Sequence, residues 1–316
     1  MSPGTSLTLR TGRGFAWNWG LAALLVGLAL GPVAARMLAY PYLASLAARA
    51  TILAAASVSL QLVVGLAGLV SLGHAAFVGI GAYAALALAM LGLNEAAVSL
   101  PAGIAGAAAF AFGTGRLALR TRGVTFIMIT LAFAQMAYFV AQSFEVLGGD
   151  DGAPLDPPRL LGTSILAQPF ALNALALVVL AGLVLGSRRL AASRFGRVLR
   201  AATESEARVT AAGFDVRRAR LAVYGLAGAA GGLAGWLLAV HAGFVSPAML
   251  EWRLSGELLV MVILGGVARP EGAAIGAVAV VAAEEVLSGL TGHWRLIFGP
   301  LIIALVLLRG RGLVRG

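Results

Sequence analysis

The feature that most constrains this chain is its long apolar segments, which leave few positions for charge. Hydrophobic residues occupy 60% of the 316 positions and charged residues only 11%, and the mean hydropathy is +0.94. A soluble domain does not tolerate this composition, whereas a bilayer core about 30 Å thick requires about 20 mostly apolar residues per spanning helix. The runs are continuous and lack the alternation of barrel strands, so they predict an all-α, polytopic integral membrane protein.

The apolar segments predict ten transmembrane helices. The expected spans lie near residues 20–39, 43–64, 70–92, 96–115, 123–146, 168–187, 220–241, 254–268, 272–290 and 295–308. The chain then divides into a polar tail at 1–19, a transmembrane domain at 20–308 with a charged loop at 188–219, and a second tail at 309–316.

Arginine placement predicts the orientation, because short cytoplasmic loops accumulate positive charge. With ten spans and a cytoplasmic N-terminus, every arginine cluster between or beyond the spans falls on one side, and the acidic segment GGDDGAPLDPPR falls on the other. Both termini and the loop at 188–219 are therefore expected in the cytoplasm. Arg36 and Arg49 border the first outer loop and are expected to extend to the membrane interface.

The chain contains no cysteine and no lysine. A Walker A loop requires a lysine on the nucleotide phosphates, so the chain cannot bind ATP in that way. Cysteine nucleophiles and Schiff-base chemistry are excluded as well. His241 and His293 are too scattered to suggest a metal site. We therefore expect no enzymatic activity, no cofactor and no metal.

The charged loop between the sixth and seventh spans has the pattern of a helix. Arg200 and Glu204, and then Glu204 and Arg208, stand four residues apart and predict ion pairs along one helix face. Gly213 is a predicted helix stop, and Asp215 is a predicted N-cap for the seventh span.

The same loop has an apolar stripe formed by Phe195, Leu199 and Ala202. Spacing alone leaves two interpretations open. The first is an amphipathic helix that lies on the membrane surface, held by anionic lipid. The second is a docking surface for a cytoplasmic partner.

Several segments, in this order along the chain, resemble the LivM-type permeases of branched-chain amino acid ABC importers. The resemblance extends over roughly residues 50 to 308. The segments are GLAGLVSLGHAAFVGIGAYAAL from Gly65, RGVTFIMITLAFAQM from Arg122, GGDDG from Gly148, SRFGRVLRAATESEARVTAAGFDVRRARLAVYGLAGAAGGLAG from Ser193 and VSPAMLEWRLSGELLVMVILGGVARPEGAAIGA from Val245.

This resemblance implies that the charged loop contains a coupling helix that sits in a cleft of an ATPase subunit. Glu206, Ala207 and Gly213 occupy the Glu, Ala and Gly places of the EAA...G pattern of importer permeases, although Arg208 stands where a small residue is usual and the glycine comes one residue late. The residues expected to couple to the ATPase are Arg197, Arg200, Glu204, Glu206, Ala207 and Gly213.

The resemblance also implies the partners and the location. The partners are a second, LivH-like permease, two ABC ATPase subunits and an external solute-binding protein, together with the lipid of a bacterial inner membrane. The expected cargo is a branched-chain amino acid, and urea or a short amide is the alternative within the family. An ion-driven secondary transporter is a further alternative, but it requires buried carboxylates or histidines near the midplane, and the spans contain few.

The segment SLGHAAFVGIGAY is the strongest candidate for a substrate pathway. Its glycines could weaken a helix at membrane depth, where a broken helix can line a cavity. A lone histidine at such a break is also compatible with ordinary packing, and polar residues of the fifth span are also compatible with hydrogen bonding between helices. The candidate pathway residues are Ser71, Gly73, His74, Gly79, Gly81, Thr130 and Gln135.

Small residues at GxxxG spacing allow helices to approach closely in lipid. The seventh span contains two such pairs, Gly228 with Gly232 and Gly231 with Gly235. They predict either close packing within the chain or an interface with a second permease. Glu284 and Glu285, near the outer end of the ninth span, point about 100° apart and are expected to have structural or interfacial roles rather than a shared one.

Overall fold

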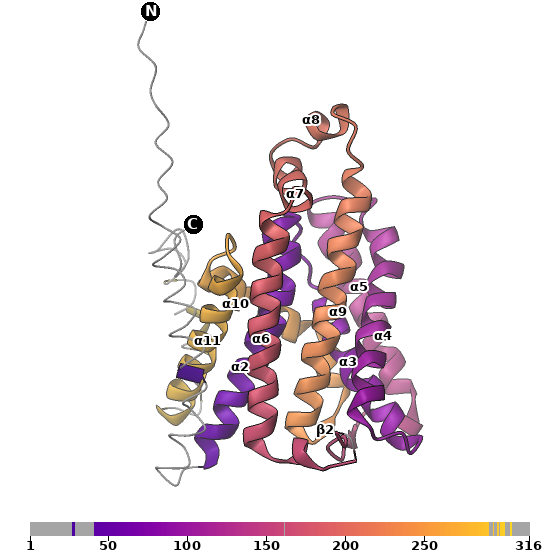
Figure 1. The fold of residues 1–316 in the computed structure, drawn as a ribbon, viewed down its shortest axis with the longest axis vertical. Coiled ribbons are helices and arrows are strands. Elements are labelled where there is room, and N and C mark those ends of the chain that lie inside the picture. Colours follow the sequence, from indigo (N-terminus) through magenta and orange to yellow (C-terminus); the bar gives the residue numbers. More distant parts are fainter. Residues whose placement is uncertain are drawn as a thin grey trace, which may run out of the picture.

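The computed structural model describes residues 27, 28, 41–160, 162–290, 293, 296, 298–300 and 304. These residues form a bundle of α-helices (Figure 1). The helices are α2 (Pro41–Gln61), which continues into a π-helical turn (Leu62–Leu66), α3 (His74–Met90), α4 (Ala96–Ala118), α5 (Val124–Ser143), α6 (Pro169–Ala192), α7 (Arg194–Glu204), α8 (Glu206–Ala211), α9 (Val216–Ala242), α10 (Trp252–Gly265) and α11 (Pro270–Leu290).

Eight of these helices overlap the second to ninth predicted spans. Six are long and apolar enough to cross a membrane, which confirms an all-α, polytopic membrane protein; α3 and α10 are shorter, with 17 and 14 residues. The predicted span near 20–39 lies almost entirely outside the described residues, and the span near 295–308 lies mostly outside them. Both tails lie wholly outside.

The charged loop is shorter than the sequence predicts. Helix α6 continues to Ala192, because Arg188 in its last turns forms an ion pair with the buried Glu271 of α11. Helix α9 begins at Val216, where the side chain of Asp215 accepts a hydrogen bond from the backbone of Arg218 over 3.0 Å. The predicted N-cap is therefore confirmed, and the connection spans residues 193–215.

The helices are arranged around α2 and α9, which are the most buried of the membrane-length helices. Helix α9 packs against α3 and α4 on one side and against α2 on the other, and α10 and α11 pack beside α2. Helices α7 and α8 project beyond one end of the bundle (Figure 1). At the opposite end, β1 (Ala153–Pro154) pairs antiparallel with β2 (Phe244–Val245) and joins the connection before α6 to the end of α9.

The glycine pairs of α9 face two different helices of the same chain. A Cβ atom at Gly228 or Gly232 would meet Ala107 and its neighbours on α4, whereas a Cβ atom at Gly235 would overlap the carbonyl oxygen of Val78 on α3. Gly231 faces Phe77 of α3. Of the two interpretations of these pairs, the structure supports close packing within the chain.

Replacing Gly235 with valine should destabilise the bundle. The new side chain would overlap the backbone of α3, and overpacking of this kind costs about 1 to 3 kcal/mol. Gly182 of α6 is the matched control, because a Cβ atom there meets nothing within 4 Å. Thermal unfolding of the purified variants should show a lowered midpoint for Gly235→Val and an unchanged midpoint for Gly182→Val; equal midpoints would contradict the packing described here.

Candidate substrate pathway and coupling segment

A non-helical segment separates α2 from α3 inside the bundle. Helix α2 ends in a π-helical turn, residues 67–73 form no helix, and α3 begins at His74. The side chain of His74 nevertheless contacts Ser59, fifteen residues earlier in α2. The chain therefore reaches the end of α2, turns, and runs back along it in an irregular conformation before α3 starts. We call residues 67–73 the unwound segment.

His74 is fully buried at the start of α3. The hydroxyl of Ser59 donates to the carbonyl oxygen of Ala56 over 2.6 Å and lies 2.6 Å from Nε2 of His74. Since Ser59 has a single hydroxyl proton, Nε2 of His74 is assigned as the donor to Ser59. Nδ1 is then a buried acceptor, and it has no hydrogen-bond partner.

The backbone around the unwound segment is bonded by hydroxyl groups. Ser255 of α10 accepts from the backbone N–H of Ala75 over 2.8 Å, and Ser71 accepts from the backbone N–H of Gly73 over 3.3 Å. Gly73 itself packs on α5, because a Cβ atom there would lie 2.5 Å from the carbonyl oxygen of Thr130. Backbone that leaves a helix at membrane depth is tolerated only where such partners exist.

Helix α9 contributes an aromatic side chain to the same place. The hydroxyl of Tyr224 lies close to the side chains of Ser71 and Thr114, and its ring packs edge-on against Phe77 with the centroids 5.4 Å apart. Side chains from α2, α4, α5, α9 and α10 thus surround the C-terminal end of the unwound segment and the start of α3, whereas Gly68 and Val70 are exposed.

Four of the seven predicted pathway residues come together here: Ser71, Gly73, His74 and Thr130. The sequence predicts that Gly79 and Gly81 weaken a helix, but both lie inside α3, which is continuous from His74. They are packing positions instead, where a Cβ atom would overlap the side chain of Leu250 or the carbonyl oxygen of Gly232.

Gln135 is the remaining predicted pathway residue, on α5. Its Oε1 atom is buried and has no hydrogen-bond partner. This oxygen therefore makes none of the hydrogen bonds between helices that the sequence also allows.

The charged connection forms two helices rather than one. Ser205 has extended backbone (φ −156°, ψ 99°) between α7 and α8, and Gly213 (φ +88°) follows the end of α8, as predicted. We call α7 and α8 together the coupling segment. Among the described ion pairs, neither predicted pair of Glu204 is present, because Arg208 lies on the second helix and Arg200 points elsewhere.

Two arginines of α7 hold it to the end of α6. Arg197 donates to the carbonyl oxygen of Ala192 over 2.8 Å, and Arg200 donates to that of Ala191 over 2.5 Å. These carbonyl groups end α6 and have no partner within the helix, so the two guanidinium groups cap it. The predicted apolar stripe is confirmed, since Leu199 is buried against the bundle.

Glu206 makes two ion pairs at the start of α8. Arg122, just before α5, donates to its Oε1 over 2.7 Å, and Arg220, in the second turn of α9, donates to its Oε2 over 2.7 Å. The side chain of Glu206 therefore joins the coupling segment to two helices that also contact the unwound segment. Both carboxylate oxygens of Glu206 are thus used within the chain, while its side chain remains 25% exposed.

The coupling segment also contacts the unwound segment directly. Gly68 (φ +66°) packs against Thr203 of α7, where a Cβ atom on Gly68 would lie 2.7 Å from the threonine methyl group. If α7 moves, either Gly68 moves with it or this contact breaks.

Charged residues nearer the opposite end of the bundle are paired as well. Arg49 of α2 is predicted to extend to the membrane interface. Its guanidinium group lies 3.2 Å from the carboxylate of Glu284 of α11, so it also has an ion-pair partner within the protein. Tyr42 donates to Glu285 over 2.7 Å. The two adjacent glutamates thus have separate partners, as predicted, and both join α2 to α11.

Sequence reasoning missed several residues that these two sites require. Ser59, Ser255 and Tyr224 gave no signal beyond being single polar positions in apolar spans. Arg122 and Arg220 were visible only as members of arginine clusters. Their partners are 84 and 14 residues away in the sequence, and only the folded chain brings them together.

Comparison with known proteins gives a consistent family assignment. The family model described as branched-chain amino acid transport system / permease component matches residues 42–307. The high-affinity branched-chain amino acid transport system permease proteins LivM of Escherichia coli (strain K12) and Salmonella typhimurium (strain LT2) are each 30% identical over 282 residues. The match covers 81% of the chain and 66% of each relative, so the chain spans just under two thirds of their length. No solved structure matches the chain.

Replacing Glu206 with glutamine should loosen the coupling segment. The variant keeps the size and helix propensity of the side chain but leaves Arg220, which is only 14% exposed, without its carboxylate. A loss of about 1 to 3 kcal/mol is expected, between the values for exposed and buried pairs. Glu204→Gln is the control, since Glu204 is exposed and in no described ion pair. Hydrogen exchange of α8 should rise in the first variant only; equal exchange would contradict the role of Glu206.

Proposed function

Because the chain belongs to the family of permease components of branched-chain amino acid transport systems, we propose that it is the transmembrane subunit of an ABC importer for branched-chain amino acids. Its matched relatives are named as high-affinity permeases of that substrate class. The observation that carries the proposal is the direct contact between the coupling segment and the unwound segment, at Thr203 and Gly68. The chain has no lysine and so no Walker A loop of its own. This contact is a route by which movement of another subunit can reach the proposed pathway.

The proposed topology has ten spans, with both termini and the coupling segment in the cytoplasm. Among the described residues, the arginines that follow α4 and α10 and those of the coupling segment support it. The end that carries β1 and β2 contains Asp150, Asp151 and Asp156, together with two arginines, Arg159 and Arg253. An asymmetry of this sign is typical of a cytoplasmic face opposite an outer face.

The exposed surface of the coupling segment is the proposed docking site for an ATPase subunit. Glu204, Ala207 and Gly213 are exposed there. A hollow of about 380 Å³ between α7 and α8 is lined by residues that include Val198, Ala201 and Val209. Arg197, Arg200 and Glu206 have the complementary role of transmitting movement, because they bind α6, α5 and α9.

The unwound segment is the proposed pathway element. Discontinuous helices near the middle of the membrane supply polar backbone and helix termini to a substrate while the rest of the bundle stays apolar. Ser71, Gly73, His74 and Thr130 are the proposed residues, and the unpaired Nδ1 of His74 is an acceptor for a substrate ammonium or amide group.

The proposed assembly adds a second, LivH-like permease, two ABC ATPase subunits and an external solute-binding protein, in a bacterial inner membrane. The family match over residues 42–307 supports the role of this chain as the permease subunit. The other subunits are proposed because the family is named as one component of a transport system.

Reconstitution tests the energy source. Proteoliposomes that contain the whole proposed assembly should accumulate leucine when ATP is supplied, and those that contain only this chain should accumulate none under a sodium or proton gradient. In the assembly, Glu206→Gln should retain the ATPase subunits but lower uptake by roughly tenfold, a usual size for a lost coupling contact. Glu204→Arg should instead weaken ATPase co-purification. Gradient-driven uptake by the single chain would refute the proposal.

Cysteine labelling tests the topology. The chain has no native cysteine, so single cysteines can be introduced without background. Asp156→Cys should react with a membrane-impermeant maleimide on intact spheroplasts, and Ala201→Cys should react only after permeabilisation. The opposite pattern would invert the proposed orientation.

A further inference from the structure

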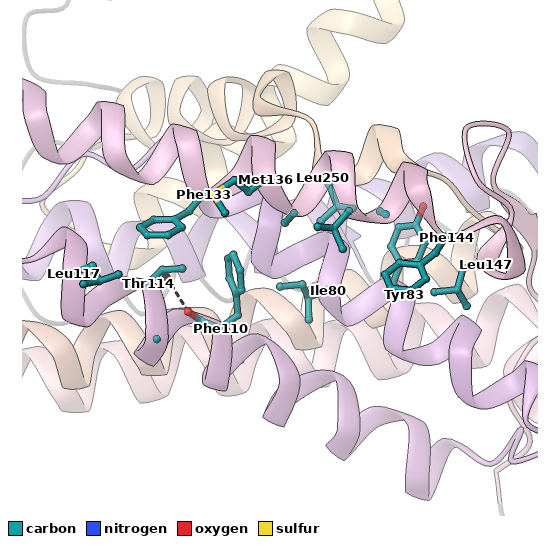
Figure 2. A pocket seen from close by; sticks show the side chains of 14 residues that line it. Ile80, Tyr83, Phe110, Thr114, Leu117, Phe133, Met136, Phe144, Leu147 and Leu250 are labelled. Carbon is teal, nitrogen blue, oxygen red and sulfur yellow. Dashed lines mark hydrogen bonds between the residues drawn. The ribbon is translucent and has the colours of Figure 1, made fainter.

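An apolar groove runs along the outer side of the bundle between α4 and α5 (Figure 2). Its volume is about 530 Å³, and its lining includes Phe110 and Leu117 from α4, Phe133 and Met136 from α5, and Tyr83 from α3. Leu117 lies at one end of the groove and Leu147 at the other (Figure 2). The groove therefore follows the direction of the helices over much of their length.

The groove faces the bilayer side of the bundle. Helices α4 and α5 are the least buried of the membrane-length helices, and Met136, Phe139 and Val140 are each more than half exposed. An exposed apolar surface of this size in a membrane protein is covered either by lipid or by another protein helix.

The side chains of the groove suit a lipid chain better than a helix. Helices associate in membranes through small residues that let their backbones approach. In this chain the GxxxG pairs of α9 are used against α3 and α4, as described above. Gly113, Ala137 and Ala141 also line the groove, but its wall has no GxxxG pair and is formed mainly by bulky phenylalanine, methionine and leucine side chains. A flexible acyl chain fits an irregular channel of this kind without requiring close backbone contact.

Positive charge is concentrated at the Leu117 end. Arg116 and Arg120 are exposed beside it and take part in no described ion pair, and Arg217 donates to the carbonyl oxygen of Arg116 over 2.9 Å. Residues 110, 113, 114 and 117 of α4 line the groove at helical spacing. Arg120 lies in the turn that follows α4, where its backbone N–H donates to the carbonyl oxygen of Leu117 over 3.1 Å. A ligand with its apolar part in the groove would therefore place its polar part among these arginines.

We propose that the groove and these arginines form a binding site for an anionic phospholipid, with one acyl chain in the groove and the phosphate against Arg116 and Arg120. Basic pockets between helices on the cytoplasmic side of a membrane bind anionic head groups. A phosphate also matches the planar, bidentate hydrogen bonding of a guanidinium group better than a neutral polar group does. None of the proposed pathway residues lines the groove, and the exposed docking surface of the coupling segment does not contribute to it.

The test is lipid titration of the purified full chain, read by native mass spectrometry. Dioleoyl phosphatidylglycerol should bind roughly 30-fold more tightly than dioleoyl phosphatidylcholine, as expected for two arginine contacts. Arg116→Gln with Arg120→Gln should abolish this preference and leave binding of phosphatidylcholine unchanged. Arg194→Gln with Arg208→Gln is the control, because these exposed arginines lie outside the groove and in no described ion pair.

A second variant tests the groove itself. A Cβ atom at Gly113 meets nothing within 4 Å although Gly113 lines the groove, so Gly113→Phe should leave the bundle folded and lower binding of both lipids. Gly182→Phe on α6, equally open, should change neither. Unchanged phosphatidylglycerol affinity in the Arg116/Arg120 variant, or unchanged lipid binding in Gly113→Phe, would overturn the proposal. So would cross-linking of Met136→Cys to the second permease in the assembled transporter, which would make the groove a subunit interface.

Discussion

A bilayer supplies no water to backbone groups, and this constraint determines how the centre of the protein is built. The chain leaves helical geometry at residues 67–73, so the groups exposed by the break need partners from the protein. Serine side chains supply them, with Ser71 accepting from Gly73 and Ser255 from Ala75. A buried hydroxyl group costs free energy unless it is hydrogen-bonded, and these two serines are bonded to the backbone at the break.

Close helix packing is the second condition for that break. Gly73 seats the unwound segment on the backbone of α5, and Gly231 brings α9 within reach of His74 and Phe77. Larger residues at these positions would separate the helices and open the polar centre to lipid. The outer faces of α4 and α5, by contrast, carry mainly bulky side chains and form an irregular groove.

The charges of the coupling segment act mainly within the chain. Arg197 and Arg200 cap α6, and Glu206 joins α8 to α5 and α9. These contacts are all short, and Arg220 is the best shielded of the arginines that make them, so α7 and α8 are expected to move with the helices they bind. Together with the contact at Gly68, this makes the shape of the segment, more than its charge, the property that a partner subunit can act upon.

The sequence by itself determined the membrane class, the approximate positions of eight described helices, the polar segment between α6 and α9, its apolar stripe and the Asp215 cap. These follow from hydropathy and local spacing, which act within a few turns of helix. It did not determine where α3 begins, which glycines pack rather than break a helix, or that Glu206 pairs with Arg122 and Arg220. Those features depend on pairs such as Ser59 with His74, Gly235 with Val78 and Arg122 with Glu206. Only the tertiary structure decides such pairs, because a hydrogen bond or a van der Waals contact depends on distance in space and not on distance along the chain.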